Sequence, residues 1–216
     1  MRLFWIVSLC IVLAGKFISP AQAVDLSIDH NRIVMSGILY GDREFDRLLA
    51  YVKEHPQART VLMRNFFGGI NMSTFVGVAN FIREQGLSTE VSGRCVSACA
   101  IAFLGGVTRR TAPDANPEGT FVAFHGISQR GQLAEEWRGT FVNALKRLTG
   151  GRMSEVVATQ SFEVFNDGYI AFYDGHRYKR PDGTSVFRCA GNERKKTHDC
   201  PGVKGVDAHM QGVYTR

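Results

Sequence analysis

Short apolar runs rich in β-branched residues alternate along this chain with longer runs in which apolar residues recur every three or four positions. The first pattern predicts β-strands, and the second predicts amphipathic helices. The expected strands are 32–39, 60–63, 87–91 and 120–124. The expected helices are 45–52, 72–85, 97–104 and 132–148. Strands that alternate with helices form a mainly parallel sheet with helices packed on it, so this pattern predicts an α/β fold.

The pattern changes near the C-terminal end of the chain, where aromatic residues and turns dominate. Two Asp-Gly pairs, at 174–175 and 182–183, are flanked by apolar runs, and such pairs are typical of β-hairpins. We therefore expect an α/β domain over 24–165 and a small, hairpin-rich β appendage over 166–216.

The first 23 residues have the pattern of a secretory signal peptide. Arg2 gives a positive start, 3–15 form an apolar run, and 21–23 end in the small-x-small pattern that signal peptidase accepts. An uncleaved N-terminal anchor is the alternative. No later segment is apolar over the length of a membrane span. We expect a periplasmic or secreted protein without stable membrane insertion after cleavage.

Composition fits one globular unit with a sizeable core. The chain has 216 residues, of which 44% are hydrophobic and 21% charged, and this balance argues against disorder. Its net charge is +6, and removal of 1–23, with Arg2 and Lys16, leaves about +4. So small a charge is not the footprint of a nucleic-acid-binding protein, and we expect no nucleic-acid partner.

Four cysteines follow the signal peptide, at Cys95, Cys99, Cys189 and Cys200. An even number in an exported protein suggests two disulfides, and pairing of sequence neighbours is the simplest of three connectivities. A zinc site is the alternative, because His198 lies close to Cys200, but neither pair has the C-x-x-C spacing of such sites. We expect two disulfides, and neither a metal nor an organic cofactor.

Gly68 and Gly69 lie between an expected strand and an expected helix. Glycines in such a turn let backbone N–H groups face a substrate carbonyl oxygen, as an oxyanion hole requires. Most glycine pairs form turns without such a function, so this motif alone is a weak signal.

Ser97 and His125 are the candidate catalytic side chains. Ser97 lies in a turn of small residues that leads into an apolar helix, where free N–H groups favour a developing oxyanion. The alternative is a serine that only caps the helix. His125 ends an apolar strand before a glycine, from where its ring can reach a cleft as a general base. The alternative is a buried histidine bonded to the backbone.

The order and spacing of the glycine pair, Ser97 and His125 resemble the Clp protease proteolytic-subunit family of the crotonase-like superfamily. The turn Cys-Val-Ser-Ala-Cys at 95–99 is similar to the Cys-x-Ser-Ala-Cys turn of a periplasmic branch of that family. The resemblance covers 33–150 and includes the segment 105–110. It implies a Clp-protease/crotonase-like ββα superhelix, to which the disulfide-stapled C-terminal β appendage is added.

The resemblance also implies a function for each matching residue. Ser97 corresponds to the nucleophile and His125 to its base. The backbone N–H groups of Gly69 (or Gly68) and Ala98 correspond to the oxyanion hole.

Two further expectations concern the Cys95–Cys99 disulfide and the formation of a homo-oligomer. A Cys95–Cys99 disulfide would rigidify the serine turn, with a redox switch as the alternative. Relatives of this fold form trimers or larger rings, so we expect a homo-oligomer in which the helix 132–148 provides contacts.

The chain departs from the family at the position of the acidic member of the catalytic triad, for which it has no clear match. Asp167 and Asp174 are the candidates, with a slight preference for Asp167. Both precede a glycine, so an aspartate that only shapes a turn is the alternative for each. Without an orienting carboxylate, a Ser–His pair loses much of its rate.

The sequence therefore favours an exported serine hydrolase, a peptidase that acts on polypeptides. The alternative is a catalytically inactive Clp-like protein that binds peptides or a partner protein in the periplasm. Acyl-thioester chemistry, as in crotonase relatives, ranks last because it needs no Ser–His pair and the periplasm lacks coenzyme A.

Overall fold

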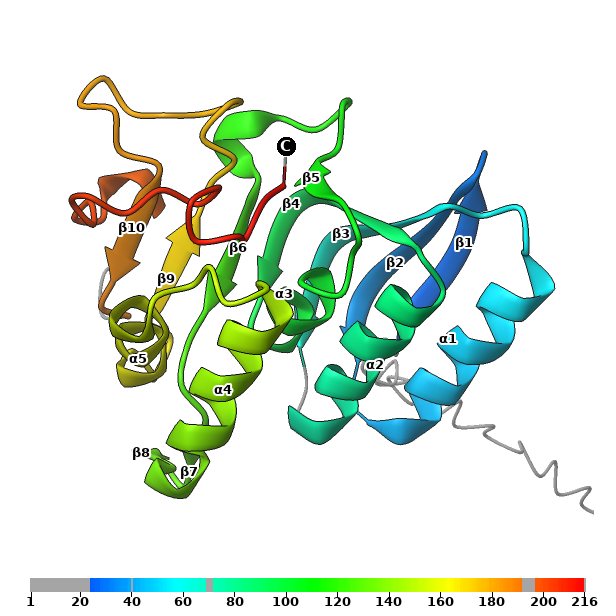
Figure 1. Ribbon diagram of the computed structural model, residues 1–216, viewed down its shortest axis with the longest axis horizontal. Coiled ribbons are helices and arrows are strands. Elements are labelled where there is room, and N and C mark those ends of the chain that lie inside the picture. The colour runs from blue at the N-terminus through cyan, green and yellow to red at the C-terminus, as the bar shows by residue number, and fades with distance from the viewer. Residues whose placement is uncertain (1–23, 40, 69–71, 192–196, 216) are drawn as a thin grey trace, which may run out of the picture.

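A mixed eight-stranded β-sheet forms the centre of the fold (Figure 1). The computed structural model describes residues 24–39, 41–68, 72–191 and 197–215, so the predicted signal peptide lies outside the described residues. The strands pair in the order β1-β2-β3-β4-β6-β9-β10, and β5 pairs with β4. Their bounds are β1 Asp25–Asp29, β2 Arg32–Leu39, β3 Thr60–Gly68, β4 Ser88–Val96, β5 Arg109–Thr111, β6 Phe121–Phe124, β9 Tyr169–Phe172 and β10 Val186–Cys189. A separate hairpin pairs β7 Ser128–Gln129 with β8 Gln132–Leu133.

Parallel pairing dominates the middle of the main sheet. β2, β3, β4 and β6 are parallel neighbours, and β5 runs parallel to β4. β1 at one edge runs antiparallel to β2, and β9 and β10 at the other edge run antiparallel to their neighbours. The expected α/β fold with a mainly parallel sheet is confirmed, and the edge strands make the sheet mixed.

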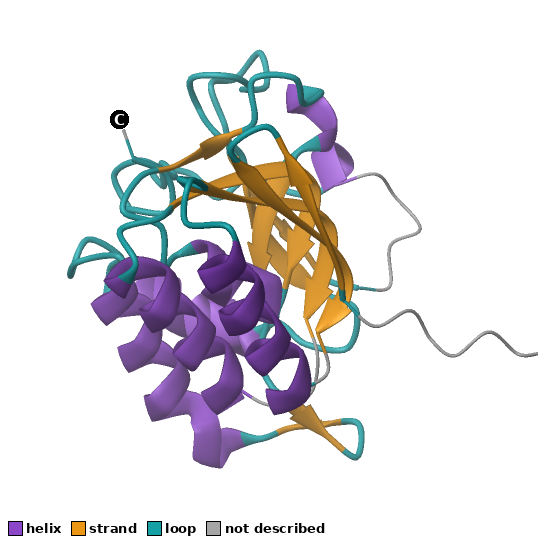
Figure 2. Cartoon of the chain, turned by 90° about the vertical axis from the view of Figure 1, so that its right-hand side faces the viewer, coloured by secondary structure: helices purple, strands orange, loops and turns teal. Residues whose placement is uncertain are grey.

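The α-helices lie together on one side of the sheet (Figure 2). The helices are α1 Asp42–Glu54, α2 Met72–Glu84, α3 Ala98–Phe103, α4 Arg138–Leu148 and α5 Glu155–Glu163, with 3-10 turns η1 Pro117–Gly119, η2 Glu135–Trp137 and η3 Thr197–Asp199. On α2 the predicted apolar face, including Phe75, Val78 and Ile82, is buried. Every residue of the short helix α3 is buried. Among the described residues, no helix combines the length and the apolar character needed to cross a membrane.

β3 and β4 are both longer than the sequence predicts, because facing bulges let each strand continue through an expected loop. The strands predicted at 60–63 and 87–91 extend to Gly68 and Val96. Their register shifts around Asn65, which has a φ of 43°. The Asn65 side-chain oxygen accepts the N–H of Arg94 at 3.2 Å and so bridges the interrupted ladder. Such a contact between distant residues leaves no mark on the local pattern.

The helix predicted at 132–148 begins later, at Arg138. Arg130 and Gly131 both have positive φ, 51° and 77°, and form the two-residue turn between β7 and β8. η2 then leads into α4. Hairpins of this kind are usually marked by Asn-Gly or Asp-Gly, and Arg-Gly is a weaker signal.

α5, β1 and β5 are absent from the sequence prediction. β5 has three residues, too few for a periodic pattern. α5 follows Ser154, whose hydroxyl accepts the Val157 N–H at 3.3 Å, so an N-cap signal for this helix was present in the sequence.

Both expected disulfides are confirmed. Cys95 is bonded to Cys99, and Cys189 at the end of β10 is bonded to Cys200. The second bond staples the segment that follows β10 to the sheet. β9 pairs with β6, so the C-terminal hairpin continues the main sheet.

An aromatic cluster and a buried arginine hold the C-terminal part of the chain. Tyr173 packs against Phe121 of β6 and Phe187 of β10, with ring centroids 5.3 and 5.4 Å apart. The last residues return to β5, where the buried Arg109 guanidinium donates to the carbonyls of Val213 and Gly212 at 3.0 and 2.8 Å. These contacts join the end of the chain to the middle of the sheet.

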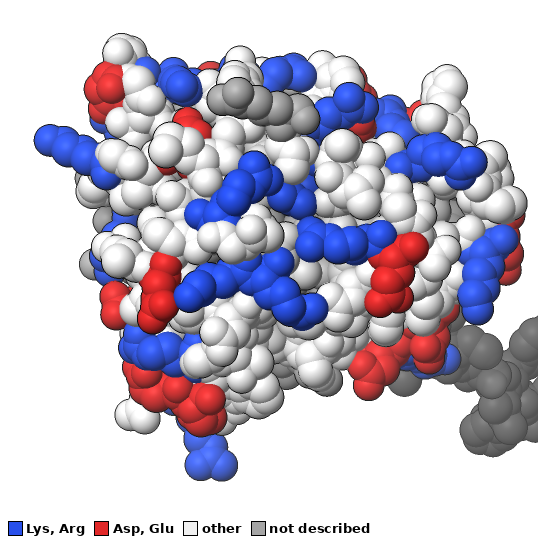
Figure 3. All heavy atoms as spheres, in the orientation of Figure 1, with Lys and Arg blue, Asp and Glu red and all other residues white. Residues whose placement is uncertain are grey.

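Basic side chains gather across the middle of the helical face (Figure 3). Arg83, in the last turn of α2, donates to the carbonyls of Leu104 and Leu148 at 2.6 and 2.8 Å. These two carbonyls lie at the C-terminal ends of α3 and α4. Cations are stabilised there by the helix dipole and the free carbonyls. Part of the positive charge of the chain therefore stabilises the C-terminal ends of these helices.

Candidate active site

Three neighbouring parallel strands end at the same edge of the sheet. β3 ends at Gly68, β4 leads into Ser97, and β6 leads into His125. The Ser97 N–H donates to the Ala123 carbonyl of β6 at 2.9 Å, which ties the serine turn to the strand before His125. Functional groups of open α/β sheets gather at the carboxyl ends of the strands. The topology brings these three predicted positions together.

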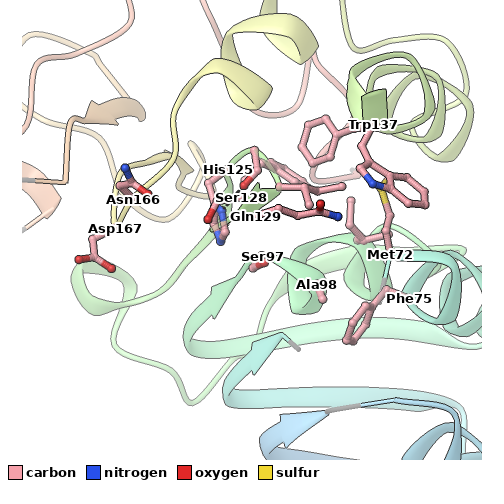
Figure 4. A pocket seen from close by; sticks show the side chains of 15 residues that line it. Met72, Phe75, Ser97, Ala98, His125, Ser128, Gln129, Trp137, Asn166 and Asp167 are labelled. Atoms are coloured by element: carbon pink, nitrogen blue, oxygen red, sulfur yellow. Dashed lines mark hydrogen bonds between the residues drawn. The ribbon is translucent and has the colours of Figure 1, made fainter. Parts of the chain in front are cut away.

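Ser97 and His125 line one pocket of about 490 Å³ (Figure 4). The apolar lining residues are Met72, Phe75, Ala98, Ile101, Phe124, Ile127, Trp137 and Phe141, and Gly126 lines the pocket with its backbone. The polar lining residues are Ser97, His125, Ser128, Gln129, Asn166 and Asp167. In Figure 4, Ser97 and His125 lie between an apolar wall on one side and Asn166 with Asp167 on the other. A concave site with an apolar wall and a few convergent polar groups is typical of a ligand-binding pocket.

Ser97 adopts a backbone conformation that is rare for a non-glycine residue. Its φ is 64° and its ψ is −125°, and such conformations cost about 1–3 kcal/mol. Ser97 occupies the N-cap position of α3, but its hydroxyl makes no capping hydrogen bond. A sharp turn of this kind between a strand and a helix presents a serine hydroxyl to a pocket.

The Cys95–Cys99 disulfide spans the serine turn. Its Cα atoms are 5.2 Å apart, and both residues are fully buried. The two sulfurs lie 3.9 and 3.7 Å from the sulfur of Met63 on β3. The bond links the end of β4 to the first turn of α3 on either side of Ser97. Burial in the core favours a structural staple over a redox switch, because reactive cysteines are partly exposed.

Gly68 passes directly against the first turn of α3. A Cβ atom at position 68 would lie 2.1 Å from Ala98 Cβ and 2.3 Å from the Ala98 nitrogen, so only glycine fits there. The backbone of Gly68 therefore lies beside Ala98, one of the predicted oxyanion donors. Gly69, the other predicted donor, lies outside the described residues.

The His125 ring is partly buried, and within the described ranges it makes one hydrogen bond. Its Nδ1 lies 2.8 Å from the Gly126 carbonyl oxygen. Because a carbonyl can only accept, Nδ1 carries the proton and Nε2 carries the lone pair. Burial lowers the pKa of His125 and outweighs the Gly126 hydrogen bond and the Asp167 charge, which both raise it. A neutral imidazole with a free Nε2 is the form that a general base requires.

The two candidate acids lie in different surroundings. Asp167 lines the pocket, on the side of His125 away from Ser97 (Figure 4). Asp174 is buried and lies outside the pocket lining, where its carboxylate accepts hydrogen bonds from His209 Nε2 at 2.9 Å and the His176 N–H at 3.1 Å. Of the two candidates, Asp167 is the one at the site. Within the described part of the chain, no hydrogen bond joins it to His125, and none joins His125 to Ser97.

The sequence does not predict most of the pocket wall. Trp137 belongs to η2, Gln129 to β7 and Asn166 to the turn before β9, and none of these stands in a recognisable motif. Phe141 lies on the apolar face of a predicted helix, and the sequence pattern predicts only that such a side chain is buried in the core. In the described ranges, no group of three or more His, Cys, Asp or Glu side chains is placed to hold a metal ion.

No family model matches the chain, and no curated protein matches it. Solved structures that are similar to part of this chain include those of two proteases and of an enoyl-CoA hydratase. One is a membrane-bound stomatin-specific protease in complex with a substrate peptide, with 15% identity, a TM-score of 0.41, and coverage of 60% of this chain and 62% of that protease. A peptidase from Plasmodium falciparum has 10% identity and a TM-score of 0.43, over 62% of this chain and 84% of the peptidase. An enoyl-CoA hydratase from Mycobacterium marinum has 10% identity and a TM-score of 0.40, over 64% of this chain and 67% of the hydratase. The chain thus spans less than two thirds of the stomatin-specific protease.

Proposed function

We propose that this chain is an exported serine hydrolase that cleaves polypeptides, with Ser97 as the nucleophile and His125 as its base. The observation that carries the proposal is that both side chains line one pocket at the ends of the paired strands β4 and β6. The Ser97 hydroxyl makes no capping bond, and no described residue forms a hydrogen bond with His125 Nε2. A serine with a neutral imidazole beside it is the pair that nucleophilic catalysis requires.

In the proposed reaction, Ser97 Oγ attacks the peptide carbonyl carbon while its proton passes to His125 Nε2. The carbonyl oxygen becomes an oxyanion, for which the N–H groups of Ala98 and Gly69 are the proposed donors. His125 then gives the proton to the leaving amine. Water hydrolyses the acyl-enzyme with His125 again as the base.

The pocket lining supports a polypeptide as the substrate. Aromatic and aliphatic side chains form the wall beside Ser97, including Trp137, which is 36% exposed. Such a wall can bind an apolar side chain next to the scissile bond. β7 borders the same pocket with exposed residues, and an extended peptide can pair with an exposed strand.

The disulfides support the export part of the proposal. All four cysteines that follow the predicted signal peptide are paired. Disulfides form and persist in oxidising compartments and are rare in the cytosol.

Labelling with a fluorophosphonate tests the proposed nucleophile. Ser97 Oγ should attack the phosphorus, release fluoride and form a covalent adduct, which peptide mass spectrometry can locate. Ser97→Ala should abolish the adduct, and His125→Ala should slow labelling by at least about a hundredfold, the usual minimum contribution of a general base. The matched control is Ser27→Ala, an exposed serine of β1, which should label at the wild-type rate. Absence of an adduct on oxidised protein with a native near-UV circular dichroism spectrum would refute the proposal.

The rate of labelling should depend on pH through His125. Only the neutral imidazole can accept the Ser97 proton, so the rate should fall as the pH drops through the pKa of His125 in the folded protein. Burial lowers that pKa, so the midpoint should lie below about 6.5, the ordinary value for histidine. Labelling rates measured at constant ionic strength, from about two pH units below to about two pH units above the ordinary pKa of histidine, would locate the midpoint. A midpoint above the ordinary value would contradict the effect of burial.

A binding protein without catalytic activity is the second candidate. It is favoured by the lack of a hydrogen bond between Ser97 and His125, and between His125 and Asp167, in the described structure. The apolar wall would then hold a peptide side chain. Saturable quenching of Trp137 fluorescence by apolar peptides, without any fluorophosphonate adduct, would support this candidate over the first.

A further inference from the structure

We infer that the Gly126 carbonyl, and not a carboxylate, orients the His125 base. This inference rests on the proposed function, since it concerns the same Ser97–His125 pair. It makes the site a serine–histidine dyad whose third member is a backbone group. Gly126 is thus a positioning residue that acts through the imidazole.

The first step is the tautomer of the imidazole. His125 Nδ1 donates to the Gly126 carbonyl oxygen at 2.8 Å. In a Ser–His–Asp triad the carboxylate has the same function, because it holds the proton on Nδ1 and leaves Nε2 to face the serine. The Gly126 carbonyl already accepts the hydrogen bond from Nδ1, so a carboxylate is not needed to select this tautomer.

The second step is the rigidity of the acceptor. The Gly126 N–H donates to the Val164 carbonyl at 2.7 Å, and the Ala134 N–H donates to the Ile127 carbonyl at 2.8 Å. A Cβ atom at position 126 would lie 1.9 Å from the Phe162 carbonyl oxygen, so the backbone is pressed against the end of α5. The peptide group between Gly126 and Ile127 is therefore held on both sides. Its carbonyl can fix the direction of the ring as a preorganised dipole.

The third step is the position of Asp167. Asn166 and Asp167 both have positive φ, 51° and 66°, and the Gly168 N–H closes the turn by donating to the Phe165 carbonyl at 3.2 Å. Asp167 is exposed on this turn. It acts on His125 by its charge through space and not by a hydrogen bond. An interaction of an exposed charge is weakened by water and salt.

The experiment compares Asp167→Asn with a matched variant on the far part of the fold, Asp46→Asn, an exposed aspartate of α1. The second-order rate of fluorophosphonate labelling is measured against pH for both variants and the wild type. For Asp167→Asn we expect the plateau rate to fall by less than tenfold and the midpoint to move to lower pH, because a charge that raises the pKa of His125 is removed. Asp46→Asn should change neither quantity. A fall of the plateau by a thousandfold or more, the scale on which a triad responds to loss of its acid, would overturn the inference.

Nitrogen-15 NMR of the imidazole gives an independent readout that does not need an active enzyme. Above the pKa of His125, wild type and Asp167→Asn should both show a protonated Nδ1 and an unprotonated Nε2, with the resonances assigned by their loss in His125→Gln. A change of tautomer in Asp167→Asn would refute the inference. If wild-type Ser97 does not label at all, the proposed function fails, and the NMR result still decides what orients the ring.

Discussion

Gly68→Ala should slow fluorophosphonate labelling of Ser97 by at least about a hundredfold, the loss that a misplacement near 1 Å causes at a catalytic centre. The added Cβ would lie 2.1 Å from Ala98 Cβ, so β3 and the first turn of α3 must move apart. That movement displaces the Ala98 N–H and the neighbouring Ser97 together. Forcing extra volume into a packed site should also lower the free energy of unfolding by about 1–3 kcal/mol. Labelling rates and urea unfolding of the purified variant measure the two effects.

Gly139→Ala is the matched control for this substitution. Gly139 lies in the first turn of α4, and a Cβ atom there would meet nothing within 4 Å. The same chemical change should therefore leave labelling at the wild-type rate and raise stability by at most about 1 kcal/mol, because alanine is the better helix former. Labelling of Gly68→Ala at the rate of Gly139→Ala would show that the contact between Gly68 and Ala98 does not shape the site.

The sequence predicts the parallel core of the fold well, because its signals are local. In the strand predicted at 32–39 and in the helix predicted at 72–85, the spacing of the apolar residues is set by which side of the segment is buried. Each segment carries this signal in its own sequence. The position of Ser97 next to His125 follows from that pattern, since parallel neighbours bring their carboxyl ends to one edge. The resemblance to a known family is what selects Ser97 and His125 as the candidate catalytic residues.

The parts that the sequence does not predict depend on contacts between distant segments. Asn65 extends two strands by accepting the N–H of Arg94, a residue from the neighbouring strand. The Gly126 backbone is held by its N–H, which donates to the carbonyl of Val164, a residue that lies beyond α4 and α5 in the chain. Every residue has a backbone carbonyl, so the sequence does not distinguish the one at Gly126 from the others. Only side chains such as Asp167 stand out in the sequence as candidates for a third catalytic residue. The sequence therefore offers Asp167 and Asp174 as candidates for the acid, and it does not predict the Gly126 carbonyl.

Removal of the Cys95–Cys99 bond, by Cys95→Ala with Cys99→Ala, should slow labelling of Ser97 by about tenfold or more. Ser97 is held at a φ of 64° between the two cysteines, and release of a conformation that costs about 1–3 kcal/mol lets the turn relax. The free energy of unfolding should fall by about 2 kcal/mol, since the bond closes a loop with a sequence separation of only 4. Labelling is expressed per folded molecule, with the folded fraction taken from circular dichroism.

The second disulfide provides the control that separates local from global effects. Cys189 and Cys200 have a sequence separation of 11 and staple a segment outside the pocket. Because the entropy of loop closure grows with loop length, their replacement by alanine should cost about 3 kcal/mol, more than loss of the first bond. Labelling per folded molecule should nevertheless stay at the wild-type rate. The two double variants should therefore rank in opposite order for stability and for labelling. Equal losses of labelling would mean that the Cys95–Cys99 bond stabilises the fold without holding the Ser97 turn.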